Sequence, residues 1–416
     1  MVLKHVLGLK CTICGREHTL KETRYTCTAC QSNTEVIYDY ELIKKKISRK
    51  KLARNRDYSV WRYAPFYPLA SLKLIPTQQI GWTPLYRAAR LGGQIGLNNL
   101  YIKDDGRNPS ASFKDRASSV ALVRALEDKA KLICGASTGN AASSLSCLTG
   151  GIGFRTIIFV PQSAPPAKIA QIMTFGAEII MVKGNYDQAF DLCLQATAEF
   201  GWYNRNTGFN PFTREGKKSC SFEICEQLGW QVPDWVFVSV GDGNIISGIW
   251  KGFRDLKAVG FIDRLPKLAG VQSAQSSAIA DAVARGGKLI PVSATTIADS
   301  IAVDLPRDGT MAVRAITESG GVAVKVDDKE ILEAIKTVAR GCGVFGEPAG
   351  VTAYAGVEAL AKQGKLKADD VCVAIITGNG LKDVASAAKV AGTPSIIEPT
   401  MDELKKLYTK KGERRQ

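Results

Sequence analysis

The sequence predicts an α/β protein with parallel sheets at its core and a small metal-binding segment at its N-terminus. From about residue 100 onward, short runs rich in β-branched residues alternate with longer amphipathic stretches. A crossover helix covers one face of the sheet between two parallel strands, so this alternation is typical of α/β folds. Closely spaced cysteines before residue 31 are the observation that predicts the metal-binding segment.

The individual elements follow from hydrophobic periodicity. Candidate strands lie at 132–134, 156–160, 179–182, 235–240 and 371–376, and the clearest amphipathic helices at 164–175, 186–200 and 329–340. Loops rich in glycine, hydroxyl and amide side chains follow three of these strands, at 135–141, 241–245 and 377–383. Ligands of open α/β sheets bind where strands end, and glycine lets backbone N–H groups approach an anion. We therefore expect the binding site at these three loops.

Four of the eleven cysteines form two C-x-x-C pairs separated by twelve residues; they are Cys11, Cys14, Cys27 and Cys30. The other seven are scattered singly, which is not the pattern of a disulfide framework. In a reducing compartment the two pairs predict a tetrahedral zinc ribbon, with disulfides or idle thiols as the alternative. Four thiolates leave no open position, so the zinc would supply folding free energy and not catalysis.

Charge and histidine content restrict the possible functions. Of the formal net charge of +15, eight positive charges lie in an acid-free run from Lys44 to Arg56. Such a run is more often a solvated helix face or linker than a nucleic-acid site. The only histidines are His5 and His18, so the remaining chain cannot build Ser-His or Cys-His nucleophile systems. With no apolar run long enough to span a membrane and no N-terminal signal pattern, we expect a cytoplasmic protein.

One lysine stands out by its position. The segment from Asn108 to Ala117 places Lys114 at the start of a predicted helix. There the helix dipole and the nearby Arg116 would lower the pKa of the lysine and favour the neutral amine needed for a Schiff base. The composition of the segment alone would equally suit an ordinary surface lysine.

The segment around Lys114 resembles the cofactor-lysine motif of fold-type II pyridoxal-phosphate enzymes. The loop at 137–141 is similar to their substrate-carboxylate loop, and 377–383 resembles a signature of threonine synthases. The ribbon, Trp61-Arg62-Tyr63 and 81–85 also occur in the zinc-ribbon branch of that family. The resemblance implies a two-domain fold-type II enzyme that binds pyridoxal 5'-phosphate and Zn²⁺ and forms a homodimer.

The resemblance also implies a division of the chain. We expect a zinc ribbon at 1–38, a basic linker at 39–80, a large cofactor-binding domain from 81–125 and 205–395, a small mobile α/β domain at 126–204, and a C-terminal tail at 396–416.

The resemblance implies a role for each motif residue. Lys114 would carry the cofactor and move protons, with Phe113 against the ring, Asn140 on its phenolate oxygen and Thr377 facing its nitrogen. The cofactor phosphate would lie on the backbone of Gly241, Asp242, Gly243, Asn244 and Ile245, and the substrate carboxylate on Ser137, Thr138 and Gly139. The implied reaction is γ-elimination of phosphate from O-phosphohomoserine, a small phosphorylated amino acid, followed by addition of water at Cβ to give threonine.

The sequence departs from the family pattern at three places. Thr213 stands where the family often has arginine, so the substrate phosphate would be bound by Arg214, Lys217 or Lys218. The phosphate loop, Gly-Asp-Gly-Asn, is tight, and Asp242 must point away from the anion. Ala111 replaces a glycine common two residues before Phe113.

Three other functions fit parts of the sequence. A β-replacement on O-phosphoserine, as in cysteate synthases, would use the same cofactor. A hydroxyamino-acid dehydratase is less favoured because neither the ribbon nor the 377–383 signature is associated with it. A nucleic-acid module formed by the ribbon and the basic run would leave the rest of the chain without a role.

Overall fold

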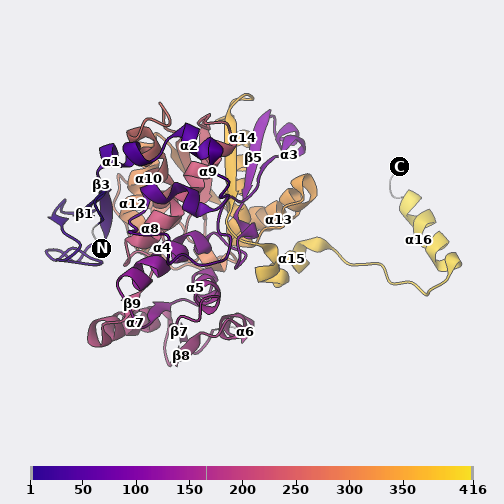
Figure 1. Cartoon of the computed structure of the whole chain (residues 1–416). Coiled ribbons are helices and arrows are strands. Elements are labelled where there is room, and N and C mark those ends of the chain that lie inside the picture. Colours follow the sequence, from indigo (N-terminus) through magenta and orange to yellow (C-terminus); the bar gives the residue numbers. More distant parts are fainter. Residues whose placement is uncertain (1–2, 165, 414–416) are drawn as a thin grey trace.

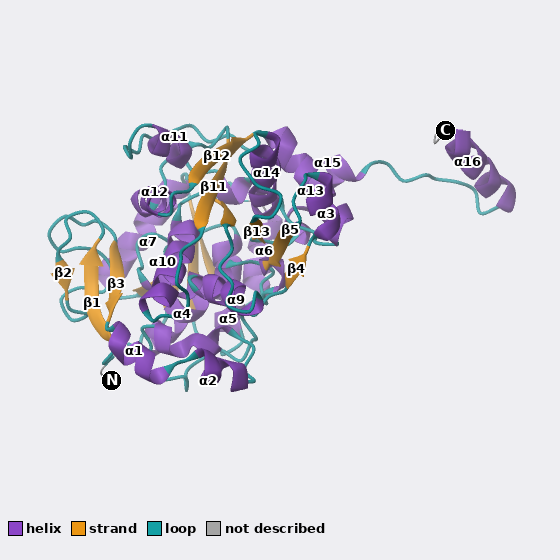
Figure 2. Cartoon of the chain, turned by 90° about the horizontal axis from the view of Figure 1, so that it is seen from above, coloured by secondary structure: helices purple, strands orange, loops and turns teal. Residues whose placement is uncertain are grey.

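The computed structural model describes residues 3–164 and 166–413, which form three separate sheets (Figure 1). The N-terminal sheet is antiparallel with the strand order β2-β1-β3. Its strands are β1 (Val6–Cys11), β2 (Glu17–His18) and β3 (Thr34–Tyr38). Figure 2 shows this ribbon at one side of the body.

The basic run forms two short helices, α1 (Tyr40–Lys46) and α2 (Arg49–Arg54). Their buried residues are Ile43 and Leu52, while most of the lysines are exposed. The run is therefore a solvated face of two helices that pack on the body by single apolar side chains. A 3-10 helix, η1 (Val60–Phe66), follows, and its aromatic residues enter the core of the large domain.

The largest sheet has six strands in the order β12-β11-β10-β13-β5-β4, in which only the edge strand β4 is antiparallel. Its strands are β4 (Leu85–Arg87), β5 (Asn99–Asp104), β10 (Trp235–Ser239), β11 (Lys267–Ser273), β12 (Val322–Val326) and β13 (Val371–Ile376). Along β10, Val236 and Val238 pack into one core cluster, and Trp235 and Phe237 into another. Successive side chains of a strand point to opposite faces, so both faces of this sheet are covered.

Helices cover the two faces of this sheet (Figure 1). They are α3 (Ala89–Gln94), η2 (Asp105–Arg107), α4 (Lys114–Glu127), α8 (Phe212–Lys217), α9 (Ser219–Gln227), α10 (Asn244–Ala258), α11 (Ala278–Ala284), η3 (Asp299–Ile301), α12 (Gly309–Glu318), α13 (Asp328–Cys342), α14 (Pro348–Lys362), η4 (Gly380–Asp383) and α15 (Val384–Ala391).

A smaller parallel sheet has the order β8-β7-β6-β9. Its strands are β6 (Ile133–Ala136), β7 (Thr156–Pro161), β8 (Glu178–Val182) and β9 (Tyr203–Asn204), and its helices are α5 (Asn140–Gly150), α6 (Pro166–Thr174) and α7 (Tyr186–Phe200). Two apolar clusters line its two faces. The predicted boundaries at 125 and 204 fall next to this sheet, and its mobility as a separate domain stays a prediction.

The predicted α/β class is confirmed, and each of the five predicted strands and three predicted helices is present within a few residues of its expected bounds. The C-terminal tail contains a helix, α16 (Met401–Glu413), which lies away from the body at the end of an extended segment (Figure 1). The last residues of the predicted tail, 414–416, lie outside the described residues. No helix in the described part of the chain is long and apolar enough to cross a membrane.

Candidate active site

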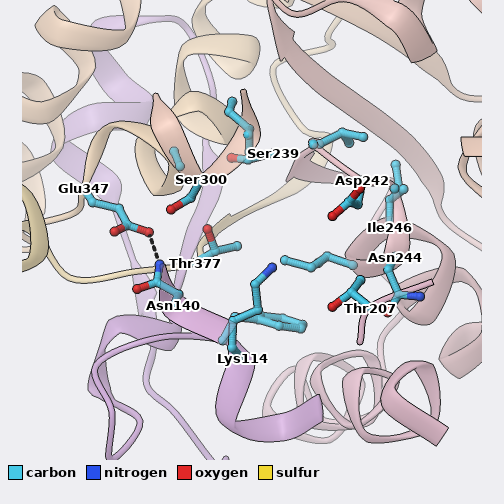
Figure 3. Close-up of a pocket in the computed structure, with 17 residues that line it drawn as sticks. Lys114, Asn140, Thr207, Ser239, Asp242, Asn244, Ile246, Ser300, Glu347 and Thr377 are labelled. Carbon is cyan, nitrogen blue, oxygen red and sulfur yellow. Dashed lines mark hydrogen bonds between the residues drawn. The ribbon is translucent and has the colours of Figure 1, made fainter. Parts of the chain in front are cut away.

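A pocket lies where the loops after β10 and β13 meet the starts of α4, α5 and α10 (Figure 3). The three predicted glycine-rich loops all contribute to it or border it. Its lining includes Phe113, Lys114, Asn140, residues 239–246, Ser300, Glu347 and Thr377. The pocket thus lies at the strand ends where the sequence predicts the binding site.

Lys114 begins α4 and extends its amine into this pocket (Figure 3). Burial lowers the pKa of Lys114, and the positive charge of Arg205 lowers it further. The predicted influence of Arg116 was wrong, because its guanidinium is turned away and is held in buried ion pairs with Asp105 and Glu223. The neutral amine is thus favoured by desolvation and by a different cation.

Backbone hydrogen bonds attach the segment before Lys114 to the loop after β13. The N–H of Phe113 donates to the carbonyl of Thr377 (2.8 Å), and the N–H of Asn379 donates to that of Ala111 (3.1 Å). Ala111 has φ of 61°, a left-handed conformation that favours glycine. This conformation explains why a glycine is common at this position in the family that the sequence resembles. Phe113 is buried directly beside the lysine.

The loop after β10 packs tightly against residues 307–312. Gly243 has φ of 87°, and a Cβ there would lie 2.7 Å from the Cβ of Ala312 and 2.9 Å from the carbonyl oxygen of Asp308. Asp242 accepts a hydrogen bond from the N–H of Arg307 (3.1 Å), so this carboxylate is bound to backbone. The first N–H groups of α10 have no carbonyl partner within the helix, and they face the pocket as an anion-binding end. The loop therefore fits a phosphate group.

A carboxylate that the sequence did not identify stands across the pocket. Asn140 donates its side-chain amide to Glu347 (2.7 Å), and burial raises the pKa of Glu347 (Figure 3). Glu347 directly precedes Pro348 at the start of α14, which in sequence is an ordinary helix beginning. Nothing in the local pattern therefore distinguishes it. The hydroxyl of Thr377 also lines the pocket.

The loop between β6 and α5 borders the pocket with partly exposed residues. Ser137 lies after the strand and accepts a hydrogen bond at its hydroxyl from the N–H of Gly139 (3.1 Å). Thr138 and Gly139 are also partly exposed and immediately precede Asn140, the first residue of α5. The N-terminal end of this helix can receive a carboxylate.

The three cations predicted to bind the substrate phosphate are all buried, but they have different partners. Arg214 forms an ion pair with Asp308 (2.6 Å), and Lys218 pairs with Glu215 (2.6 Å) and Asp255 (2.7 Å). None of the three cations, Lys217 included, lines the pocket itself.

Lys217 differs, because its amine donates to the side-chain oxygen of Asn244, a residue of the phosphate loop. Burial lowers the pKa of Lys217 well below its usual value, and repulsion from Lys114 and Arg205 adds to the effect.

The four predicted cysteines come together in the ribbon. The sulfur atoms of Cys11, Cys14, Cys27 and Cys30 all lie within 4.8 Å of one another, and all four are free thiols. The N–H groups of Ile13 and Cys14 donate to the sulfur of Cys11 (both 3.4 Å), and that of Ala29 donates to Cys27 (3.4 Å). Sulfur atoms that accept N–H groups on two tight turns fit a tetrahedral metal ion.

The fold and the site together define a class of enzyme. A desolvated lysine amine faces a glycine-rich loop at the N-terminus of a helix, which suits a phosphorylated carbonyl cofactor that forms a Schiff base with the lysine. A family described as "Pyridoxal-phosphate dependent enzyme" matches residues 76–378.

Individual relatives narrow this class. The chain is 41% identical to a threonine synthase of Methanocaldococcus jannaschii over 96% of this chain and 98% of the relative. It is 37% identical to a threonine synthase of Methanosarcina acetivorans over 95% of this chain and 97% of the relative. The chain belongs to the pyridoxal-phosphate-dependent enzyme family and, within it, to the threonine synthases.

Solved structures show the same fold. The processed form of threonine deaminase isoform 2 from Solanum lycopersicum superposes with a TM-score of 0.64 at 25% identity, covering 74% of this chain and 86% of that chain. Maize serine racemase superposes with a TM-score of 0.64 at 22% identity over 74% of this chain and 91% of that chain. The predicted fold-type II architecture is thereby confirmed.

Proposed function

We propose that the protein converts O-phosphohomoserine and water into threonine and inorganic phosphate, with pyridoxal phosphate held on Lys114. The observation that carries this proposal is the position of Lys114 between two anion-binding helix ends, in a chain that matches threonine synthases over nearly its whole length. When bound, pyridoxal phosphate withdraws electrons from an attached amino acid and so stabilises negative charge beside its amino nitrogen.

The residues of the pocket supply the binding of this cofactor. We assign its phosphate to the backbone N–H groups of residues 241–245, the face of its ring to Phe113, and its phenolate oxygen to Asn140. The hydroxyl of Thr377 would meet the ring nitrogen. A neutral hydroxyl protonates that nitrogen less fully than a carboxylate would, which moderates the withdrawal of electrons.

Proton transfer falls to Lys114, because the chain has no histidine in the pocket. Its lowered pKa lets the amine accept a proton from Cα of the substrate and return one to a neighbouring carbon. The substrate carboxylate would lie on Ser137, Thr138 and Gly139 at the start of α5. Of the three predicted substrate cations we retain Lys217, since Arg214 and Lys218 are neutralised by buried carboxylates.

We propose a structural Zn²⁺ for the four thiols of the ribbon. A reducing compartment, and therefore the cytoplasm, is supported by the eleven free cysteines. We further propose a homodimer and a small phosphorylated amino acid as the binding partner, as the family resemblance implies.

The experiment is product analysis with the cofactor-loaded protein. O-phosphohomoserine should give threonine and inorganic phosphate in equal amounts, and Lys114→Ala should abolish both. O-phosphoserine with and without sulfite is the control for β-replacement. The proposal would be overturned if phosphate were released only from O-phosphoserine, and only when sulfite is present.

A further inference from the structure

Arg205 is a buried arginine that forms no ion pair with a carboxylate of the described residues. It follows β9 and is 3% exposed. Its Nε donates to the hydroxyl of Ser118 (3.2 Å) and one terminal nitrogen donates to the hydroxyl of Thr207 (2.9 Å). The other terminal nitrogen, Nη2, is buried and has no hydrogen-bond partner among the described residues.

Other buried arginines of the chain, unlike Arg205, form ion pairs with carboxylates. Arg116 is held by Asp105 and Glu223, Arg214 by Asp308, and Arg62 by Glu226. Burial lowers the pKa of Arg205 to about 10, the opposite direction from Arg116 and Arg214. A desolvated charge without a counter-ion destabilises the folded protein. Such a charge is best explained by an anion that arrives from solution.

Arg205 does not itself line the pocket, but its charge acts on the amine of Lys114, so it lies close to the reacting atoms. Its partner Ser118 lies one helical turn after Lys114 on α4, and its partner Thr207 lines the pocket. The hydroxyl of Thr207 accepts its hydrogen bond from Arg205, so its own proton is free to be donated. Figure 3 shows Thr207 beside Asn244, on the side of Lys114 away from Glu347.

The reactants of the proposed function bring three anionic groups to this pocket. The start of α10 suits the cofactor phosphate and the start of α5 suits the substrate carboxylate. For the third group, the substrate phosphate, α8 offers only Lys217, whose amine is held by Asn244. Thr213 stands where the family often has arginine, and Arg214 and Lys218 are already paired. Another cation near the pocket, Lys382, donates to Ser143 on α5 and is more exposed than Arg205.

We propose that Arg205, together with the hydroxyl of Thr207, binds the phosphate group that leaves the substrate. This inference rests on the proposed function, because it takes O-phosphohomoserine as the substrate. Arg205 thereby replaces the family arginine from a different element, the end of β9 in place of α8. The guanidinium can donate two parallel hydrogen bonds to phosphate oxygens once the anion is present.

The test compares Arg205→Gln with Arg155→Gln, which removes an exposed arginine paired with Glu178 in the same sheet. In cofactor-loaded protein, Arg205→Gln should raise KM for O-phosphohomoserine and the inhibition constant of inorganic phosphate by about ten- to a hundredfold, the loss expected for a charge-assisted hydrogen bond. The amount of bound cofactor should stay unchanged. Arg155→Gln should leave all three values unchanged.

Thermal unfolding separates a binding role from a structural one. Removing an unpaired buried charge should leave the Tm of phosphate-free protein unchanged or raise it, whereas loss of a structural residue would lower it. Inorganic phosphate should raise the Tm of the wild type and not that of Arg205→Gln. If Arg205→Gln does not fold, Thr207→Val and Arg205→Lys test the same site, with a smaller increase in both constants.

Unchanged phosphate inhibition in these variants would overturn the inference, as would a phosphate response lost in Lys382→Gln instead. A wild type that makes no threonine but responds to phosphate through Arg205 would overturn the substrate assignment and leave the anion site standing. A wild type that makes threonine while Arg205→Gln keeps its KM would overturn the anion site alone.

Discussion

Asn33 in the ribbon donates its side-chain amide to the backbone carbonyl of Arg307 at 2.7 Å. Arg307 in turn donates its N–H to Asp242 in the loop after β10. Beside it, Asp308 accepts from Asn244 (2.8 Å) and pairs with Arg214, which also donates to the carbonyl of Thr34 in the ribbon (3.0 Å). The ribbon therefore supports the segment on which the proposed cofactor-phosphate loop rests.

This relationship predicts that Asn33→Ala weakens the affinity for pyridoxal phosphate. Loss of one hydrogen bond of about 0.5–1.5 kcal/mol would weaken it by about two- to tenfold if it is transmitted to the loop. Cofactor titration followed by visible absorbance measures the effect. Glu17→Gln is the control, because its partner is Lys10 on the exposed face of the ribbon. Equal cofactor affinity in both variants and the wild type would show that ribbon and loop are energetically independent.

Hydrophobic periodicity and motif spacing predicted the fold class, five of the strands, Lys114 and the four cysteines of the ribbon. Four of the five predicted strands, β6, β7, β10 and β13, are buried along their whole length, which gives the continuous apolar runs by which they were found. The fifth, β8, is partly exposed. The strands β4 and β9 were not expected, since two or three residues carry no periodic signal. The longer strands β5, β11 and β12 were also not predicted. Lys114 and the four cysteines were found because each belongs to a motif of fixed spacing.

The partners across the pocket could not be predicted in this way. Glu347 and Asn140 are separated by 207 positions in sequence, and their contact depends on how the two sheets are placed. The ion pairs of Arg214 and Lys218 likewise depend on Asp308 and Asp255, which lie on other elements. Sequence can propose a cation for a site, but only the fold shows whether a carboxylate already neutralises it.

The left-handed backbone at Ala111 predicts that Ala111→Gly stabilises the protein. An alanine in this region is less favourable than glycine by roughly 1–2 kcal/mol, and the greater entropy of glycine in the unfolded chain offsets part of that. We expect a gain of about 0.5–1 kcal/mol in the free energy of unfolding, measured with urea. Ala117→Gly, within α4, is the matched control and should lose stability. A loss in both variants would contradict the strain assigned to Ala111.

Two adjacent aspartates at the end of β5 should respond to substitution in opposite directions. Asp104 has no salt bridge in the described part of the chain, and burial, with repulsion from Asp105, raises the pKa of Asp104 to about 6. Asp105 instead pairs with the buried Arg116 (2.6 Å). The first carboxylate therefore opposes folding at neutral pH, whereas the second compensates a buried charge.

The pH window follows from proton binding. Between the ordinary aspartate pKa of 3.8 and the raised pKa of about 6, the folded state keeps a proton on Asp104 that the unfolded chain has released. Stability therefore falls as the pH rises through this range. Above about 6 the loss is complete and amounts to about 1–3 kcal/mol. Asp104→Asn keeps an acceptor for the N–H of Gly106 and should raise the Tm at pH 7.5, with a gain that shrinks as the pH falls towards 4.

Asp105→Asn should lower stability by about 3–5 kcal/mol because it leaves Arg116 less than fully compensated in the core. Thermal unfolding of both variants at pH 4.5, 6 and 7.5 measures the two effects side by side. A gain for Asp104→Asn that does not depend on pH would show that packing, and not titration of this carboxylate, determines its effect. The two variants thus distinguish the carboxylate of Asp104, which lowers the stability of the folded protein at neutral pH, from that of Asp105, which stabilises it by pairing with Arg116.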